Sequence, residues 1–255
     1  MSNMALICTV CFVAVAAFIS MKQKLGLEKE ILIGTFRSAV QLLFIGYVLH
    51  FVFETSHPAF IVIIILCMIL VAAWNAGAKA KHVRGIRSRI AIALACTEGV
   101  TMAILLGFRI ISPTPQYIIP VSGIIVGSSM IVCGLLLNHM KREMETARGE
   151  MEMLLALGAT EKQAIHSSLR RSVRASMIPT IDGMKTVGLV QLPGMMTGMI
   201  VAGADPVEAV RYQILIMFVL ASSAAMTAMV LSLISYRLWF AKDARLLPLQ
   251  PAEKP

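Results

Sequence analysis

The sequence predicts an all-α, polytopic membrane protein with about seven transmembrane helices, and three observations lead to that class. Of its 255 residues, 58% are hydrophobic and only 15% are charged. Soluble domains are closer to about half apolar and about a quarter charged. The apolar residues are gathered into runs of roughly 20, the length that a helix needs to cross the hydrocarbon core. Most Lys and Arg residues lie in the short segments between those runs, as is usual in membrane proteins.

Seven apolar runs are long enough to span a bilayer, and each is expected to cross it once. They cover residues 4–21, 31–53, 59–78, 90–111, 118–138, 184–204 and 212–238. The first run has no basic residue before it, because the first lysine is Lys22. A secretory signal peptide carries positive charge ahead of its apolar part, so this run is predicted to be a retained first helix.

The distribution of charge predicts the orientation of the chain. Of the 23 Lys and Arg residues, 19 lie in alternate connections, namely 22–30, 79–89, 139–175 and the tail from Arg237. The other connections, 54–58, 112–117 and 205–211, hold at most one. Cytoplasmic loops carry the excess of positive charge, so the N-terminus is expected outside and the C-terminus inside. This pattern also accounts for the net charge of +9 without a nucleic-acid partner.

The whole chain is expected to form one transmembrane domain, residues 1–245, for which the lipid bilayer is the surrounding partner. A cytoplasmic segment at about 139–178 interrupts its apolar pattern. Residues 246–255 are rich in proline and polar side chains, so they are expected to form a disordered tail.

The segment Glu150–Pro179 differs from its surroundings because it is polar, basic and helical in pattern. Its centre, Leu157-Gly158-Ala159-Thr160, is typical of a helix end followed by a helix start. Gly158 can adopt the left-handed conformation that ends one helix, and Thr160 can cap the next. Apolar residues then recur at helical spacing with basic residues between them. We expect a short amphipathic helix at the membrane surface, which either docks onto a soluble partner or lies on anionic lipid.

The chain carries no motif for catalysis or for nucleotide hydrolysis. It has no GxxxxGK[ST] phosphate loop, no HExxH pair, no GxSxG elbow and no cluster of His, Asp and Glu with metal-ligand spacing. It is therefore not expected to be an enzyme or to hold a cofactor, and no metal-binding residue can be assigned. Active transport would draw on an ion gradient or on another subunit.

The basic segment carries Glu152, then the run Leu154–Thr160 and Gln163-Ala164-Ile165. This pattern resembles the loop of ABC transporter permeases whose coupling helix seats in a cleft of the nucleotide-binding subunit. It departs from that family at Arg170-Arg171, where those permeases carry Leu-Pro. The resemblance implies a separate ATPase that binds ATP and Mg²⁺. It assigns docking to Glu152, Leu157, Gly158, Ala159, Thr160, Gln163, Ala164, Arg170 and Arg171.

A second pattern narrows the resemblance. It runs from Pro179 to Gly198 and ends in Leu192-Pro193-Gly194-Met195-Met196-Thr197-Gly198, and earlier matches are Arg37…Gln41-Leu42 and Ala73-Trp74-Asn75-Ala76. Together these are similar to the FetB (YbbM-type) permeases, over nearly the whole chain. The resemblance implies a permease subunit of the bacterial inner membrane, paired with a second copy and driven by the separate ATPase. That family is linked to iron export, with relatives in plant aluminium tolerance, so iron or a related metal is the expected cargo.

Pro193-Gly194 is expected to interrupt the helix of the sixth apolar run, since proline lacks a backbone donor and glycine frees the chain. In a bilayer, protein or water must satisfy the carbonyls that such a break frees. The break is thus either an element of the transport pathway or a packing kink. The thioethers beside it suit soft ions but also serve as adaptable apolar filler. The pathway candidates here are Gln191, Pro193, Gly194, Met195, Met196 and Met199.

Ionisable side chains at membrane depth are the remaining candidates, because each is costly unless it is paired or hydrated. Glu98 lies well inside its run, and Arg37 shares one face of an earlier helix with Gln41. Either Arg37 or Gln41 meets Glu98 inside the bundle, or Arg37 snorkels to the inner surface while Glu98 is protonated. Asp182 and Lys185 are expected to form a local ion pair, or else to line an inner gate.

Two other functions remain open on the sequence. A carrier driven by a proton gradient would use Glu98 as its proton site, with the basic segment merely bound to lipid. A non-transporting scaffold would use that segment to recruit a soluble partner. The resemblance favours the third function, which is export of iron or a related metal by the permease half of an ABC transporter.

Overall fold

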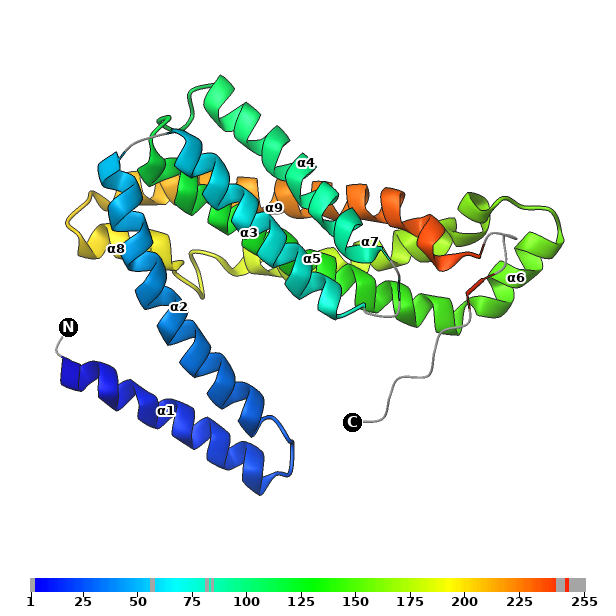
Figure 1. The fold of residues 1–255 in the computed structure, drawn as a ribbon, viewed down its shortest axis with the longest axis horizontal. Helices are drawn as coiled ribbons and strands as arrows, with labels where there is room; N and C mark the ends of the chain where they lie inside the picture. The colour runs from blue at the N-terminus through cyan, green and yellow to red at the C-terminus, as the bar shows by residue number, and fades with distance from the viewer. Residues whose placement is uncertain (1–2, 56–57, 81–82, 84, 242–245, 248–255) are drawn as a thin grey trace. The chain divides into compact units, whose positions relative to one another are not determined.

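The computed structural model describes residues 3–55, 58–80, 83, 85–241 and 246–247, and these residues are helical almost throughout (Figure 1). Their β-type pairings amount to two isolated bridges. The all-α prediction is therefore confirmed. The chain divides into two compact units, Met1–His57 and Pro58–Pro255.

The first unit is a pair of helices, α1 (Asn3–Lys22) and α2 (Glu28–Thr55), packed against each other. The reversal between them is made by Lys24 and Gly26, which both have positive φ. The Ser20 hydroxyl accepts a hydrogen bond from a backbone amide of this turn at 3.1 Å. The charged residues of the connection therefore lie together at one end of the helix pair.

The second unit is a bundle in which α5 is the central helix. Its elements are α3 (Pro58–Ala78), α4 (Ile86–Gly107), α5 (Pro115–Thr146), α6 (Arg148–Ala156), α7 (Glu161–Thr186), α8 (Gly194–Val201), α9 (Pro206–Ser235) and the short helix η1 (Tyr236–Trp239). α5 packs against α3, α4, α7 and α9. Figure 1 shows α5 and α7 continuing together to the end of the bundle that carries α6.

Small residues let these helices approach one another closely. α3 contributes Ala72, Ala73 and Ala76 to the core, and α9 contributes Ala224 and Ala228. Lipid tails are as apolar as leucine, so membrane helices are held together mainly by close van der Waals packing and hydrogen bonds. The alanines therefore define where the helices of the second unit meet.

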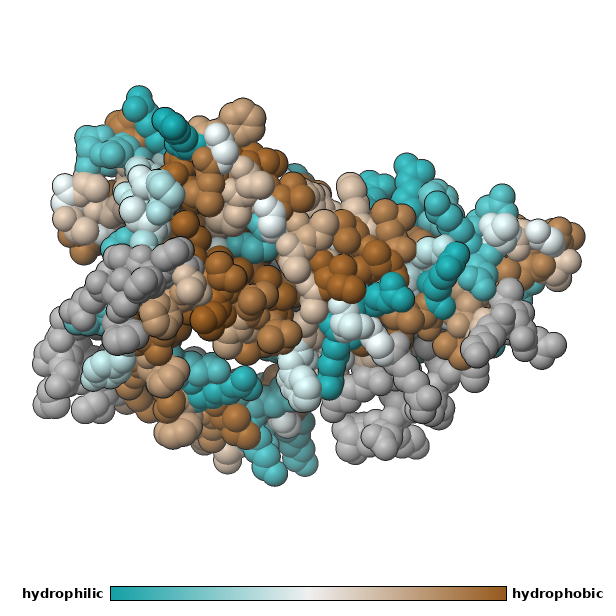
Figure 2. All heavy atoms as spheres, turned by 45° about the horizontal axis from the view of Figure 1, so that its top comes forward, coloured by the Kyte–Doolittle hydropathy of each residue, from teal (hydrophilic) through white to brown (hydrophobic). Residues whose placement is uncertain are grey.

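Among the described residues, five helices are long and apolar enough to cross a membrane, and each coincides with a predicted run. They are Glu28–His50, Ala59–Ala78, Ile86–Gly107, Pro115–Thr146 and Pro206–Trp239. The first predicted run lies in α1, and its described apolar stretch, Val10–Lys22, is shorter than these five. Figure 2 shows hydrophilic side chains at the end of the bundle that bears α6, as well as elsewhere on this face, and a more apolar middle. The number of crossings and their orientation remain predictions.

The sixth predicted run, 184–204, is interrupted, as Pro193-Gly194 predicted, but the interruption begins earlier than expected. α7 ends at Thr186 and α8 begins only at Gly194. α8 has 8 residues, which is too few to cross a bilayer. The predicted interruption is confirmed, because Pro193 has no amide hydrogen to continue a helix and instead precedes the first residue of α8. The chain therefore passes along α7, through a break, into α8.

The short amphipathic helix predicted after the turn is also corrected. α7 has 26 residues and packs against α5 and α9. α5 likewise continues to Thr146, past the predicted run 118–138. The physical reason is a stripe of small residues, Ser168, Ser172 and Ser176, buried at every fourth position of α7. This stripe lets a helix that is polar by composition lie close to its neighbours.

The C-terminal end of the described chain folds back onto the bundle. Leu246 is buried in the core, and the Leu247 amide donates a hydrogen bond to the Trp239 carbonyl at 3.0 Å. Residues 248–255 of the expected disordered tail lie outside the described residues.

Candidate functional site

The turn between α6 and α7, residues 156–160, is built as the sequence predicts. α6 ends at Ala156, Gly158 has a φ of +91°, and Thr160 caps α7. The Gln163 amide donates to the Thr160 hydroxyl at 3.4 Å, and the Thr160 amide donates to Gln163 Oε1 at 2.9 Å. This reciprocal capping satisfies two backbone donors that the start of a helix leaves open. The turn is therefore fixed by its own residues.

The surface of this turn is an apolar patch beside charged groups. Leu157 is 79% exposed, and Met153, one helical turn earlier, is exposed too. Glu152 is exposed, and its carboxylate accepts a hydrogen bond from Arg148 at 2.7 Å. Ala164 is buried, so it packs beneath the turn instead of contributing to its surface. The predicted docking residues thus divide into a surface group and a supporting group.

Arg171 joins α7 to α5. Its guanidinium lies 2.8 Å from the carboxylate of Glu143 on α5, and it donates a second hydrogen bond to the Ser168 hydroxyl at 3.0 Å. The hydrogen bond to Glu143 raises the pKa of Arg171, because it stabilises the charged guanidinium. Arg170 beside it is exposed. Both arginines are exposed, and Arg171 in addition joins α7 to α5 through Glu143.

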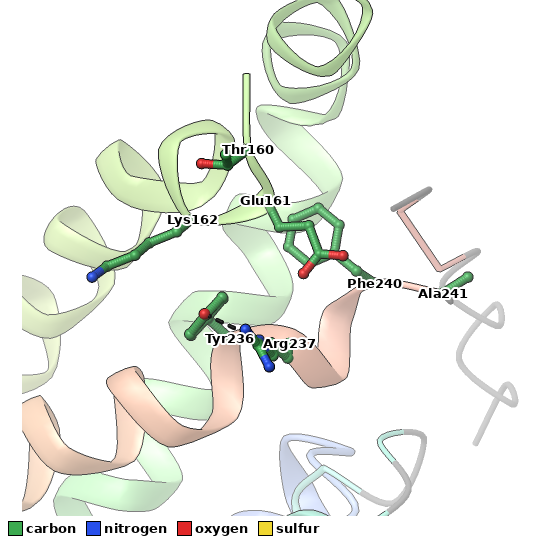
Figure 3. Close-up of a pocket in the computed structure, with 7 residues that line it drawn as sticks. All are labelled: Thr160, Glu161, Lys162, Tyr236, Arg237, Phe240 and Ala241. Carbon is green, nitrogen blue, oxygen red and sulfur yellow. Dashed lines mark hydrogen bonds between the residues drawn. The ribbon is translucent and has the colours of Figure 1, made fainter. Parts of the chain in front are cut away.

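A hollow of about 670 Å³ lies beside the turn, between the start of α7 and the segment 236–241, which comprises η1 and the residues after it (Figure 3). Glu161 extends toward Phe240, whereas Lys162 points away from it. On the other wall, Arg237 donates a hydrogen bond to the Tyr236 hydroxyl at 3.2 Å. Sequence reasoning missed the contribution of this C-terminal segment, because nothing in the residues 236–241 indicates that they lie against the start of α7.

The break between α7 and α8, residues 187–193, is the second part of the candidate site. Backbone hydrogen bonds hold it in a defined shape. The Thr186 carbonyl accepts a hydrogen bond from the Val190 amide at 3.0 Å, and the Gly188 amide donates to the Gln191 carbonyl at 3.0 Å. Gly188 has a φ of +85°, which costs glycine little. The break is therefore a defined turn, in keeping with the need to pair backbone groups in lipid.

This break borders a cavity of about 410 Å³ whose walls come from α5, α7, α8 and α9. Three predicted pathway residues, Gln191, Pro193 and Met195, meet there. Ile216 and Leu220 of α9 supply apolar wall. The heteroatom-bearing side chains are two amides, two hydroxyls and two thioethers, from Gln191, Gln213, Ser128, Thr180, Met195 and Met217.

Other predicted pathway residues do not line this cavity. Gly194, Met196 and Met199 belong to α8, but Met195 is the α8 residue in the cavity wall. Asp182 and Lys185 form the expected ion pair, with 2.9 Å between Lys185 Nζ and Asp182 Oδ1. Both are exposed on α7, so the pair is a local contact on the helix surface.

Glu98 of α4 is buried, with 4% of its surface exposed. Neither carboxyl oxygen has a hydrogen-bond partner among the described residues, although Ser122 of α5 lies beside it. Arg37 and Gln41 lie on α2 in the other unit, so their pairing with Glu98 stays a prediction. An unpaired carboxyl inside a membrane bundle is costly, which keeps Glu98 a functional candidate.

Three hydroxyls join α4, α5 and α9, and one of them belongs to Thr97, the residue before Glu98 in the chain. Thr227 Oγ1 lies 2.9 Å from Thr97 Oγ1 and 3.0 Å from Ser129 Oγ, and all three residues are buried. Each hydroxyl has one proton, so Thr227 donates one of these bonds and accepts the other. Sequence reasoning missed this network, because the alignment of hydroxyls across three helices is a tertiary property.

Gln213 is the side chain that sequence reasoning missed at the cavity. It is 5% exposed, and its Oε1 has no hydrogen-bond partner among the described residues. The signal that could have found it is an amide inside the apolar run 212–238, which costs free energy in lipid unless it is hydrogen-bonded. In the part of the chain that the structure describes, no three His, Cys, Asp or Glu side chains group closely enough to hold a metal ion.

A helical bundle with membrane-length helices, a cavity beside an interrupted helix and a capped turn at one end defines an integral membrane protein of the polytopic class. The chain belongs to the family described as Uncharacterised protein family (UPF0014), whose model matches residues 3–240. It is 47% identical over 236 residues to the UPF0014 membrane protein YjkA of Bacillus subtilis (strain 168), covering 92% of this chain and 94% of that one.

Two further relatives carry names that point to metals. The Probable iron export permease protein FetB of Escherichia coli (strain K12) is 37% identical over 253 residues, 99% of this chain and 98% of that one. The Protein ALUMINUM SENSITIVE 3 of Arabidopsis thaliana is 34% identical over 234 residues, 92% of this chain and 86% of that one. The resemblance to FetB-type permeases is therefore confirmed. No solved structure is significantly similar to the chain.

Proposed function

We propose that this chain is the membrane-spanning permease subunit of an ABC transporter that exports iron or a related metal. A separate ATPase subunit binds ATP and Mg²⁺ and supplies the energy. The cargo is supported by the similarity to a relative named a probable iron export permease. The observation that carries the proposal concerns α7. This one continuous helix runs from the fixed α6–α7 turn to the break beside the cavity.

The α6–α7 turn is the docking surface for the ATPase. Its backbone is ordered by Gly158 and by the Thr160 cap, so a partner does not have to order it on binding. Met153 and Leu157 offer apolar contact area at the centre, and charged side chains surround them. Interfaces of this kind combine an apolar centre with a polar rim.

α7 transmits movement from the docking surface to the cavity. Its 26 residues span about 39 Å at about 1.5 Å per residue. The ion pair of Arg171 with Glu143 holds its first half against α5. The carbonyl of its last residue, Thr186, accepts hydrogen bonds from amides of the break, among them that of Val190 at 3.0 Å. A displacement of the turn therefore shifts α5 and α7 together and changes the cavity wall at the break, which is the point where the chain can bend.

The chain works in the bacterial inner membrane, with its N-terminus outside and its C-terminus inside. That orientation places the α6–α7 turn in the cytoplasm, where ATP is available, and it follows from the loops that carry 19 of the 23 Lys and Arg residues. ABC transporters need two transmembrane halves, and this chain supplies one. Two copies of it and two of the ATPase complete the transporter.

Co-purification with the ATPase subunit tests the proposal. Leu157→Asp places a charge at the centre of the docking surface, so we expect the ATPase to be lost from the purified complex. Leu25→Asp is the matched control, because Leu25 is also an exposed leucine in a predicted cytoplasmic loop. If Leu157→Asp retains as much ATPase as Leu25→Asp does, the docking surface is assigned wrongly.

One observation favours a second function. The buried, unpartnered carboxyl of Glu98 is what a proton-driven carrier would need. The two functions differ in their energy source, so export from vesicles that contain both subunits distinguishes them. ATP-dependent export that survives a protonophore supports the ABC transporter, and export that needs only a pH gradient supports the carrier.

A further inference from the structure

The last part of α7 lies at the depth of the membrane. In its first half, Arg171 pairs with Glu143 of α5. Near its end, Gly183 shares the wall of the cavity with Ser128 of α5. α7 therefore runs antiparallel to α5, from the end of α5 toward its middle. Ser128 is the central residue of the apolar run 118–138, so the end of α7 lies near the middle of the bilayer.

One face of this part of α7 is exposed and carries charge. It consists of Ile178, Ile181, Asp182 and Lys185, which follow the spacing i, i+3, i+4 and i+7 of a single helix face. We call it the α7 face. Both isoleucines are exposed, and the side chains of Asp182 and Lys185 are 58% and 68% exposed. The buried serines of α7 lie on its other side, toward the bundle.

Lipid is a poor neighbour for the α7 face. A charged side chain at the centre of a bilayer is costly, and such residues almost always face protein or a water-filled space. The ion pair between Lys185 and Asp182 leaves both side chains exposed. By contrast, Val100 and Ile104 are exposed at membrane depth on α4, and both are apolar. A water-filled space at this depth also needs a second protein wall, so the α7 face requires another protein surface opposite it.

The charges of the α7 face suit a second copy of the same chain. A two-fold contact brings the same patch of both subunits together, so that residue i meets residue j and residue j meets residue i. The face carries one acid and one base, about one helical turn apart, and is therefore complementary to itself. Asp182 can pair with Lys185 of the partner subunit, and the reverse pair forms at the same time. The isoleucines supply apolar contact beside these pairs.

We propose that the α7 face packs against the same face of a second copy of this chain. This deepens the proposed function and rests on it, because it takes the pairing of two permease subunits as given. Asp182 and Lys185 form ion pairs between the two copies, and polar contacts of this kind hold membrane helices together. Each α7 also begins at the docking turn. Movement of the ATPases therefore reaches the interface between the permease subunits along α7.

Cysteine cross-linking in membranes that contain the full-length chain and the ATPase tests the interface. Ile178→Cys and Ile181→Cys each place a thiol in the α7 face, and iodine oxidises two adjacent thiols to a disulfide. Val100→Cys is the matched control, because Val100 is 41% exposed, close to the 44% of Ile181, and lies near the centre of the run 90–111. The native chain gives the background from its five cysteines. We expect at least one isoleucine variant to form several times more covalent dimer than Val100→Cys does.

Two charge variants show whether the contact includes ion pairs between the copies. Asp182→Lys makes the α7 face doubly positive, and Lys185→Asp makes it doubly negative. The two variants carry different tags and are produced together. Mixed dimers should then form more often than random pairing gives, because the unlike faces attract each other. An ion pair within one chain cannot produce this preference.

The proposal is overturned if neither isoleucine variant forms more covalent dimer than Val100→Cys, or if the two charge variants pair at random. The cysteine variants keep both charges, so their result does not depend on the folding of the charge variants. ATPase co-purification in the same preparations shows independently whether the proposed function has failed. If the ATPase is retained but the cross-link is absent, the docking surface stands and this interface is wrong.

Discussion

Replacing Gly158 by alanine should loosen the α6–α7 turn without causing a steric clash. No atom lies within 4 Å of the position that a Cβ would take at Gly158. The penalty therefore comes from the backbone alone, because a φ of +91° is a conformation that residues with a side chain rarely adopt. Holding alanine in the left-handed region costs about 1–2 kcal/mol. This cost lowers the free energy needed for local opening of the turn, so the turn should open more often.

Gly149→Ala is the matched control in the same segment. A Cβ at Gly149 also meets open space, but Gly149 lies inside α6 and is not among the glycines with positive φ. Alanine is favoured over glycine within a helix by about 0.5–1 kcal/mol, so this change should leave α6 as stable or stabilise it. The two substitutions thus add the same methyl group with opposite expected effects.

Hydrogen–deuterium exchange of the chain in nanodiscs measures the difference. A cost of about 1–2 kcal/mol corresponds to roughly 5- to 30-fold faster exchange for amides that exchange by local opening. We expect this acceleration in α6 and the first turn of α7 for Gly158→Ala, and unchanged or slower exchange for Gly149→Ala. Equal exchange in the two variants would refute the claim that a left-handed glycine holds the turn.

Three further predictions concern other parts of the chain. Arg171→Ala should lower stability by at most about 1 kcal/mol, as for a partly exposed ion pair, but it should reduce the stimulation of the ATPase by the permease. Exchanging Arg171 and Glu143 with each other should restore that stimulation. If the exchange does not restore it, the ion pair between α7 and α5 does not transmit movement. Glu98→Gln should leave the thermal stability of the chain unchanged, because the carboxyl has no partner among the described residues; a loss of about 3–5 kcal/mol would instead show a buried ion pair, as with Arg37. An enzyme that is active only outside the cell should be active when fused after Thr114 and silent when fused in the α6–α7 turn, and the reverse pattern would overturn the orientation.

The α6–α7 turn is predictable because its signals are local. Gly158, Thr160 and Gln163 lie within six residues, and each acts on the backbone of that same stretch. The membrane-length helices are predictable for a similar reason, since a run of apolar residues determines its own partition into lipid. Five of the seven predicted runs form such helices, as the structure describes them.

The length of α7 depends on contacts that hydropathy does not register. Ser168, Ser172 and Ser176 are polar by composition, yet they form the buried face that packs closely in the bundle. The same four-residue spacing is visible in the sequence and would have predicted a packed helix. In the sixth run, Pro193 predicts the interruption, but hydropathy does not show that α7 already ends at Thr186, before the left-handed turn at Gly188.

The cavity could be predicted only in part. Gln191, Pro193 and Met195 are close in sequence and mark the break. Ser128 and Gln213 complete the wall from α5 and α9, which are far apart along the chain. Which side chains of distant helices face each other is decided by their packing, so no local pattern assigns these residues to the same site.

Export by the purified subunits in proteoliposomes tests the central claim, that this chain provides a pathway whose energy comes from a separate ATPase. Vesicles that hold the chain together with the ATPase should move iron against its gradient when ATP is supplied on the side of the ATPase. Vesicles with the chain alone should only let iron equilibrate, even under an imposed pH gradient. Uphill movement of iron by the chain alone would contradict the account.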